Sequence, residues 1–499
     1  MDTKKQPMSF FKKSGRLPQI RTSPARRAYD APTRSRSQTN RLGIYLSSQR
    51  NLNVVRPWLP ISLVVGIVIL LIAAPAWLPA MRLIIPDRYL LTYAPGPIQR
   101  LIFRVDPARI VPTPATNNQN AAFALIQTPT PDEPTATPAV ANEVNTSLYV
   151  QPTAFAVAPT ATFTPVYAQA AADGRAQDRQ NAADLSRASR LLTGFKWIRQ
   201  GANDCGPASI TVLMSYWGVN FTQEDAIEAL KPNPEDPNVR PDEIAAFVET
   251  KGYHAMVRIN GNIDLLKQLI LAGYPVLIET GYDPEPLVVG WTSHYLTLVG
   301  FSDADRQFIA MDTYRRPNWG YPYEEIDKYW RQFNRRYLVV YQPDQAAAVS
   351  SLIGADMNDA TMYTSAMRTA QLELSVDRSD AFGWFNLGSS LTGLGRYQDA
   401  VSAFDQARRT GLPSRFLWYQ FSIFDAYLQQ GGEYTDQALF LANDVLASKA
   451  SEEAFYYKGM AYLSKGDKES ARQQFNLALR FNKHYEVAKQ ALAALGEAN

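Results

Sequence analysis

Residues 200–218 read QGANDCGPASITVLMSYWG, and this stretch decides the fold around it. It holds Cys205, the only cysteine of the chain, directly before Gly206 and Pro207. Pro207 suits the first residue of a helix, where its missing N–H costs no hydrogen bond. The apolar spacing over 208–217 then predicts a buried helix with Cys205 at its N-terminal end.

The position of Cys205 has two interpretations. A helix N-terminus offers free N–H groups and the positive end of the dipole, which favour a reactive thiolate. A structural thiol is the alternative, because free cysteines are among the most often buried residues. The neighbouring Asp204, Gly206 and Pro207 favour the reactive thiol, since a packed structural cysteine needs none of them.

Two later segments carry candidate partners for the thiol. Residues 293–301 read SHYLTLVGF and residues 310–317 read AMDTYRRP, and the turn residues SDAD at 302–305 predict a hairpin between two strands. Counting back from a turn near residue 303 places His294 opposite roughly Asp312. Cross-strand neighbours lie about 5 Å apart, so the carboxylate can orient the imidazole. A strand-end role for His294 and a turn-capping role for Asp312 are the alternatives.

The other histidines and nearby acids are poorer candidates. His254 lies on a polar strand face with no acid placed to orient it, and His484 lies in the C-terminal part of the chain. Asp303 and Asp305 belong to the predicted turn.

These segments resemble the C39-like, papain-like cysteine peptidases of the membrane-anchored bacterial type, over about residues 195–343. In that family a glutamine stands just upstream of Asp/Asn-Cys-Gly-Pro-Ala at the start of the central helix. Further on, a His-Tyr pair opens a strand and an aspartate ends the next strand. Gln200 with DCGPAS, His294 and Asp312 match these features in the same order.

The resemblance implies peptide-bond hydrolysis by a Cys-His-Asp mechanism, in some members after a Gly-Gly leader. It implies that Cys205 is the nucleophile, His294 the base and Asp312 its orienting group, while Gln200 and the backbone N–H of Cys205 donate to the oxyanion. The sequence departs from the family at two places. The family often has proline after the aspartate and glycine before the histidine, whereas this chain has Thr313 and Ser293.

Helices come first and strands afterwards in this part of the chain. Helices are predicted at 222–230, 241–251 and 262–272, and strands at 253–259, 275–280, 294–301, 307–312 and 336–341. This order predicts an α+β, papain-like domain with a central helix packed on an antiparallel sheet.

The N-terminal part contains a candidate membrane span. Residues 1–57 are rich in Lys and Arg and lack apolar periodicity, which predicts a disordered cytoplasmic tail. Residues 58–81 form a nearly continuous apolar run, long enough to cross a bilayer as a helix. The basic residues before the run predict a cytoplasmic N-terminus and an extracytoplasmic remainder. A cleaved signal peptide is the alternative, although its charged region is too long.

A linker follows the candidate span. Residues 82–170 comprise an apolar juxtamembrane stretch and a segment rich in Pro, Thr and Ala. From about residue 105 this composition predicts an extended spacer that cannot build a core. Residues 171–193 are predicted to be helical and to lead into the catalytic domain, which is predicted to span 171–345.

Residues 346–499 contain a repeated pattern. Trp384, Gly388, Ala400 and Phe404 follow the spacing of a tetratricopeptide repeat, in which small residues fit against large ones. A second clear copy contains Gly459, Tyr462, Ala471 and Phe475, with a looser copy over 414–448 and a capping helix at 357–374. We therefore predict an all-α solenoid, and generic helical hairpins are the alternative.

Composition limits the other functions. The 499 residues carry a net charge of only +3 and one cysteine, so the chain has no overall nucleic-acid signature and no internal disulfide. No Cys/His cluster with metal-ligand spacing and no Gly-rich phosphate loop occurs in the sequence. We expect neither a cofactor nor a metal.

The sequence as a whole predicts a cysteine peptidase held at the cell membrane by one span. Its substrate is expected to be a peptide or protein, and its repeats are expected to bind the substrate or a protein partner. A catalytically silent peptide-binding scaffold on the same fold is the alternative.

Overall fold

A computed structural model of the chain describes residues 110–116, 118–126, 188–282 and 290–496, with the single positions 73, 81 and 85. The predicted tail at 1–57, nearly all of the predicted span at 58–81 and most of the predicted linker lie outside these residues. In the part of the chain that is described, no helix is both long and apolar enough to cross a membrane.

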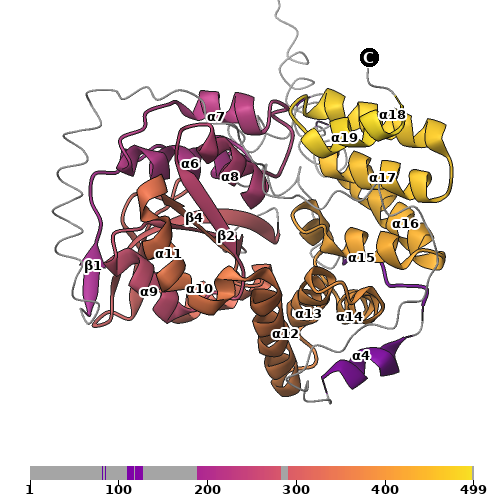
Figure 1. Cartoon of the computed structure of the whole chain (residues 1–499), viewed down its shortest axis with the longest axis horizontal. Helices are drawn as coiled ribbons and strands as arrows, with labels where there is room; N and C mark the ends of the chain where they lie inside the picture. The colour runs from indigo at the N-terminus through magenta and orange to yellow at the C-terminus, as the bar shows by residue number, and fades with distance from the viewer. Residues whose placement is uncertain are drawn as a thin grey trace, which may run out of the picture. The chain divides into compact units, whose positions relative to one another are not determined.

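Residues 188–341 form a domain built on one antiparallel sheet, here called the sheet domain (Figure 1). Its strands are β1 (Ser189–Leu191), β2 (His254–Arg258), β3 (Val276–Tyr282), β4 (Thr292–Ser302), β5 (Gln307–Met311), β6 (Trp319–Pro322) and β7 (Tyr337–Tyr341). Their order is β2-β7-β3-β4-β5-β6, and β1 pairs with β4. β4 is the longest strand, and its two halves pair with β3 and β1 along one edge while β5 pairs along the other.

Helices pack on this sheet as the α+β prediction requires. They are α6 (Cys205–Tyr216), α7 (Gln223–Leu230), α8 (Pro241–Glu249), α9 (Ile263–Leu271) and α10 (Tyr323–Trp330), with a short 3-10 turn, η4 (Arg331–Phe333). α6 is buried along almost its whole length, and Thr297 of β4 donates a hydrogen bond to the backbone of Ser209. α7 begins at a capping box, in which Thr222 and Asp225 exchange hydrogen bonds. α10 and β6 were not predicted from the sequence.

The predicted helix at 171–193 is wrong where the structure describes it. Ser189–Leu191 is the strand β1, which pairs with Gly300–Ser302 at the end of β4. The paired edge of β4 supplies hydrogen bonds that outweigh a weak local helix preference. Residues 171–187 lie outside the described part of the chain.

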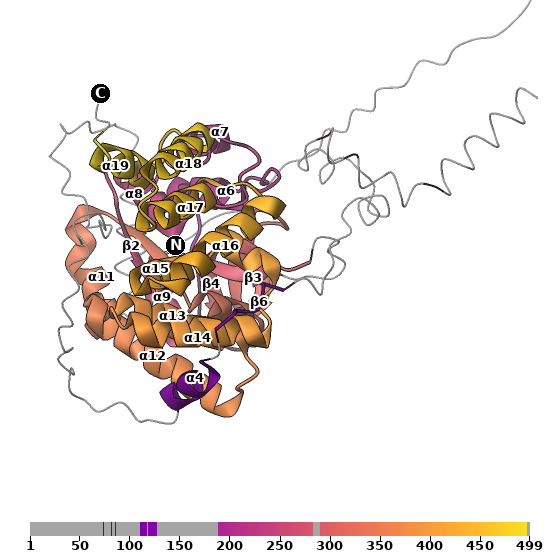
Figure 2. The same cartoon turned by 90° about the vertical axis from the view of Figure 1, so that its right-hand side faces the viewer.

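Residues 346–494 form a stack of helices, here called the helical domain, in which α12 to α19 follow one another in order (Figure 2). The helices are α11 (Ala346–Ile353), α12 (Asp359–Val376), α13 (Ala381–Gly393), α14 (Tyr397–Thr410), α15 (Ser422–Gln430), α16 (Glu433–Ser448), α17 (Glu452–Ser464), α18 (Lys468–Phe481) and α19 (Glu486–Ala494). Short 3-10 turns lie at η5 (Pro343–Gln345), η6 (Gly354–Met357) and η7 (Ser414–Trp418).

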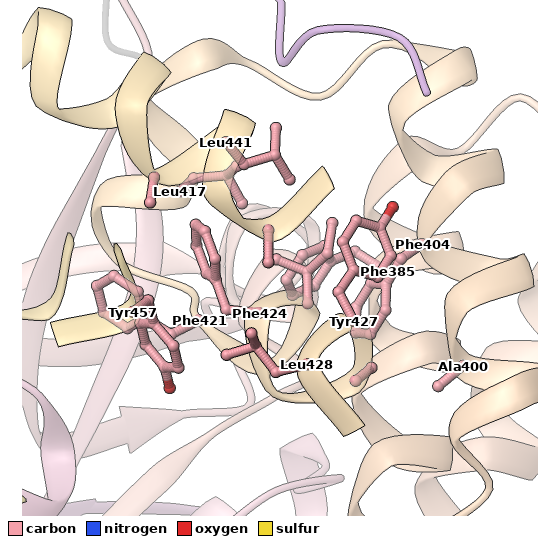
Figure 3. Packing of buried hydrophobic residues seen from close by; sticks show 14 of the residues in the cluster. Phe385, Ala400, Phe404, Leu417, Phe421, Phe424, Tyr427, Leu428, Leu441 and Tyr457 are labelled. Carbon is pink, nitrogen blue, oxygen red and sulfur yellow. The ribbon is translucent and has the colours of Figure 1, made fainter. Parts of the chain in front are cut away.

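The small-against-large packing predicted for the repeats is confirmed. A Cβ atom on Gly388 would lie 2.7 Å from the ring of Phe404, and one on Gly459 would lie 2.6 Å from the ring of Phe475. Between these two pairs, apolar side chains of α13 to α17, among them Phe424, Tyr427 and Leu441, fill the core of the stack (Figure 3). Phe385, for example, lies 4.8 Å from Phe404 between ring centroids.

The prediction that the chain from residue 105 is a spacer without a core is wrong for residues 110–116 and 118–126. Val111 is buried and its N–H donates to the carbonyl of Leu412 over 2.8 Å. The next residues form α4 (Gln119–Leu125), which packs on α14 through the buried Ala122. The small apolar residues of this short sequence, QNAAFAL, allow the close approach. This segment, distant in sequence, is therefore part of the helical domain.

Replacing Gly388 by alanine is expected to destabilise the helical domain. The new methyl group meets the buried ring of Phe404, so α13 and α14 must separate or the ring must leave its rotamer. Overpacking of this kind costs about 1–3 kcal/mol, which exceeds the gain of about 1 kcal/mol in helix propensity. Thermal unfolding of the full chain measures the effect, with the partly exposed Ser389→Ala on the same helix as control. An unchanged Tm for Gly388→Ala would contradict the packing described above.

Candidate active site

The helix α6 places Cys205 at its first residue. The first helical hydrogen bond runs from the N–H of Ala208 to the carbonyl of Asp204 over 2.9 Å, so the helix starts two residues earlier than predicted. Pro207 is the third helical residue instead of the first. Proline loses no hydrogen bond at this position, because the first four N–H groups of any helix lack partners within it. The thiol of Cys205 is partly exposed.

The residue after the thiol must be small. A Cβ on Gly206 would lie 3.2 Å from Cβ of Val239 and 3.6 Å from the ring of Tyr295. The hydroxyl of Tyr295 donates to the carbonyl of Val239 over 2.8 Å, which fixes this wall beside the thiol. The glycine of the Cys-Gly-Pro sequence therefore lets the helix start approach the sheet closely.

His294 lies near the start of β4 and is 3% exposed. Its Nε2 atom is 3.0 Å from Oδ1 of Asp312, and Cys205 is close enough to the ring to raise its pKa. Because Nε2 is engaged by the carboxylate, Nδ1 is the ring nitrogen that remains for the thiol. The structure thus brings together three of the four residues predicted for the site.

The strand register differs from the one expected from the turn. A β-bulge between Leu298 and Gly300 shifts the pairing, and the ladder ends with Thr297 opposite Met311. His294 and Asp312 are therefore not direct partners but diagonal neighbours beyond the last pair. Diagonal neighbours are 7–8 Å apart at their backbones, within reach of two side chains that point toward each other.

Asp312 is completely buried and accepts several hydrogen bonds. The hydroxyl of Tyr321 donates to Oδ2 over 2.5 Å, and the N–H groups of Tyr314 and Arg315 donate to Oδ1 over 2.8 and 3.1 Å. Burial raises the pKa of Asp312, but its hydrogen bonds with His294 and Tyr321 outweigh burial and lower the pKa to about 2. The carboxyl is therefore ionised at neutral pH.

The charge of His294 follows from the same contacts. Burial alone lowers the pKa of this imidazole, whereas the hydrogen bonds to Asp312 and Cys205 and the charge of Asp312 raise it to about 9. The net result is an imidazolium at neutral pH, placed between a buried carboxylate and the thiol. Such an arrangement allows the ring to hold and transfer a proton at Nδ1.

Gln200 is bound to Thr313, which follows Asp312 and stands where the C39-like family often has proline. The hydroxyl of Thr313 donates to Oε1 of Gln200 over 2.8 Å, and the N–H of Gln200 donates to the carbonyl of Thr313 over 2.9 Å. With Oε1 used as an acceptor, the side-chain amide presents Nε2 as its donor. The other departure, Ser293, donates to the buried Glu279 over 3.3 Å.

Several residues around the site were missed from the sequence. Tyr282 and Tyr314 flank the imidazole, with ring centroids 5.0 and 6.4 Å from that of His294. The hydroxyl of Tyr419 is 2.9 Å from Oγ1 of Thr292, two residues before His294. Tyr321 follows Asp312 by only nine residues, so it could have been considered from the sequence as a partner of the carboxylate. Tyr419 belongs to the helical domain, and no local pattern connects it to the site.

The remaining candidates lie elsewhere. His254 is exposed at the start of β2, opposite Tyr341, and His484 lies in the turn between α18 and α19. Asp303 is engaged by Lys267 over 3.0 Å and by Tyr323 over 2.8 Å. Among the described residues, one group of acids could hold a metal, and it does not include the residues of this site.

The sheet domain has the antiparallel sheet and covering helices of the C39-like peptidase fold, and the helical domain has the paired helices of repeat proteins. Residues 192–338 match the Peptidase_C39 like family, and residues 383–407 and 452–492 match the tetratricopeptide repeat. The chain therefore carries a C39-like peptidase domain followed by tetratricopeptide repeats. The looser middle copy at 414–448 lies outside the matched residues.

Three solved structures are similar to about 30% of this chain. A putative C39-like peptidase from Bacillus anthracis is 15% identical, with a TM-score of 0.26, and covers 31% of this chain and 98% of its own. The peptidase domain of Streptococcus ComA, a bifunctional ABC transporter involved in quorum sensing, is 18% identical, with a TM-score of 0.25 and coverages of 30% and 98%. A double-glycine motif protease from an AMS/PCAT transporter, solved with its leader peptide, is 16% identical, with a TM-score of 0.24 and coverages of 30% and 94%. The comparison with curated proteins found no match.

Replacing Asp312 by asparagine is expected to lower the pKa of His294 from about 9. The charge and strong hydrogen bond that favour the imidazolium are lost, while burial, which favours the neutral ring, remains. Histidine-selective NMR titration measures the change, and the chain has only three histidines to resolve. In the wild type, the His294 signal should show a protonated ring at neutral pH that loses its proton as pH rises through about 9.

The signals of His254 and His484 serve as internal controls for this titration, because neither residue contacts Asp312 in the structure. A His294 midpoint that is the same in the wild type and in Asp312→Asn would contradict the role of the carboxylate.

Proposed function

We propose that this protein is a cysteine peptidase in which Cys205 is the nucleophile and His294 the general acid and base. Asp312 orients the imidazole, and Gln200 with the backbone N–H of Cys205 binds the oxyanion. The observation that carries the proposal is the 3.0 Å contact of His294 with the buried Asp312, beside a thiol at the start of α6. These are the parts that acyl transfer by a thiol needs.

The reaction proceeds in two halves. The Cys205 thiolate attacks the carbonyl carbon of the scissile peptide, and the negative charge moves to the carbonyl oxygen beside Gln200. The C–N bond then breaks as the His294 imidazolium gives its proton to the leaving amine. In the second half His294 takes a proton from water, hydroxide attacks the thioester, and the C–S bond breaks to release the acid and the thiolate.

We place this peptidase outside the cytoplasmic membrane, anchored by a helix at 58–81 with the N-terminus inside. The support is the uninterrupted apolar run and the excess of Lys and Arg before it. Secreted peptides and peptides of the cell envelope are then the natural substrates.

The helical domain takes part in substrate recognition in this proposal. Tyr419 contacts Thr292, and Trp291 packs between the rings of Phe416 and Phe333, with centroid distances of 5.3 and 5.9 Å. The repeats therefore contact the beginning of the strand that carries His294. A peptide that approaches the thiol from this side meets both domains.

A silent peptide-binding scaffold on the same fold is the competing function. Binding alone needs neither a thiol at a helix start nor an ionised carboxyl held by four donors behind an imidazole. Burying these groups costs free energy, and a catalytic role accounts for their presence.

Electrophilic peptide probes test the nucleophile directly, since every labelled chain is labelled at its single cysteine. We expect native protein to react about 100-fold faster than urea-unfolded protein, because His294 stabilises the thiolate only in the fold. His294→Ala keeps the thiol and is the matched control, expected to react at about the unfolded rate. Equal rates for native and unfolded wild type would exclude a reactive site.

Turnover separates a peptidase from a peptide-binding protein. Mass spectrometry of a peptide library should show cleavage by the wild type and none by Cys205→Ala, which should still unfold at the same Tm. Cleavage that persists in Cys205→Ala would refute the nucleophile, and binding without cleavage by the wild type would favour the scaffold.

Replacing Gln200 by alanine is expected to lower kcat for peptide cleavage by about 100- to 1000-fold, the usual effect of losing one oxyanion donor. The rate of simple alkylation by iodoacetamide should stay near the wild-type rate, because alkylation creates no oxyanion. Thr313→Val, which removes the hydroxyl that holds Gln200, should give a smaller loss in kcat. A parallel fall in cleavage and alkylation would mean that Gln200 supports the thiol and does not bind the oxyanion.

A further inference from the structure

Three buried carboxyl groups converge where the sheet domain meets the helical domain. Asp236 lies in the loop between α7 and α8, and Glu452 and Glu453 form the first turn of α17. Each of the three residues is 1% exposed. One carboxylate oxygen from each residue lies within 4.8 Å of the others. Three carboxyl groups so close together, away from water, must either take up protons or pair with a cation.

Amide groups satisfy only half of the carboxylate oxygens. Asn238 donates its backbone N–H to Oδ1 of Asp236 and its side-chain amide to Oε1 of Glu453, both over 3.0 Å. Asn482 donates to Oε1 of Glu452 over 2.8 Å. The second oxygens, Oδ2 of Asp236 and Oε2 of Glu452 and of Glu453, are buried and receive no hydrogen bond from an amide or hydroxyl group. Asp236 and Glu452 lie close enough to hydrogen-bond each other, but only if they share a proton. Each carboxyl group is thus oriented by an asparagine and keeps one oxygen without an amide donor.

The nearby cations do not neutralise the cluster. Lys231 is buried, but its ammonium group binds Asp204 over 3.1 Å and the carbonyl of Asn203 over 2.9 Å. The guanidinium of Arg240 binds Asp242 over 2.8 Å and lies over the ring of Tyr485. A bound cation would offset the cost of burying these carboxylates, since buried charges are stable when they are paired or coordinate a metal.

We propose that Asp236, Glu452 and Glu453 bind a calcium ion that links the two domains. The ligands are all oxygen, with no histidine or thiol among them, which selects a hard cation. Calcium–oxygen distances are about 2.3–2.6 Å, so three oxygens within 4.8 Å of one another can bind one ion. Magnesium usually keeps several waters and binds only one or two carboxylates, so three carboxylates away from water favour calcium.

The position of this site connects it to the thiol. The loop that carries Asp236 continues through Asn238 to Val239, which lies against Gly206 beside Cys205. On the other side, Glu452 and Glu453 hold the start of α17. An ion here ties the loop beside Cys205 to the repeat stack.

Calcium binding to the full chain, purified in detergent and stripped with a chelator, tests the proposal without any variant. Isothermal titration with CaCl2 should show one ion per chain, and saturating CaCl2 should raise the Tm by about 5 °C or more. The same measurements with MgCl2 should show weaker binding and a smaller shift. No heat of binding and no change in Tm with CaCl2 would overturn the proposal, and an equal response to MgCl2 would overturn the choice of calcium.

Variants locate the ion. Glu453→Gln and Asp236→Asn keep the shape of the side chain and the oxygen that accepts from Asn238, but they remove a charge. Both should lose the calcium-dependent rise in Tm. Glu433→Gln is the matched control, because Glu433 is exposed in the first turn of the neighbouring helix α16 and should keep the full response. Wild-type calcium affinity in both cluster variants would place the ion elsewhere and refute the site.

Discussion

The contact between His294 and Asp312 depends on β4, and the rest of the sheet domain is arranged to keep that strand in place. β4 pairs with three other strands, and its register against β5 decides where the carboxylate stands. The bulge after Leu298 moves Asp312 to a diagonal position, and four donors then fix its oxygens. The charge of the imidazole follows from this one buried pair.

The sequence predicted the elements that carry the chemistry because their signals are local. A Cys-Gly-Pro start before an apolar helix, a turn of acidic residues between two strands and a histidine at a strand start can each be recognised within ten residues. The repeats could also be predicted from the sequence, since Gly388 and Gly459 each precede their aromatic partner by the same number of residues. The helix boundaries differ by only one or two residues from the expected ones.

What the sequence did not predict depends on contacts between distant segments. β1 is a strand only because the end of β4 has a free edge, and α4 is ordered only because α14 offers a surface. Tyr419 reaches Thr292 across more than 120 residues, and the acids of the proposed calcium site come from two domains. No periodicity or spacing rule encodes such pairings, because the partners share neither an element nor a motif.

The docking of residues 110–126 on the helical domain bears on the membrane anchor that we propose at residues 58–81. A chain free from residue 82 to residue 187 would have 106 residues and would extend up to about 360 Å. The bridge from Ile110 to Pro413 would leave the 28 residues 82–109 as the tether between the proposed anchor and the folded body. These would extend about 95 Å. Under this proposal the thiol would reach only those peptides that come within that distance of the lipid surface.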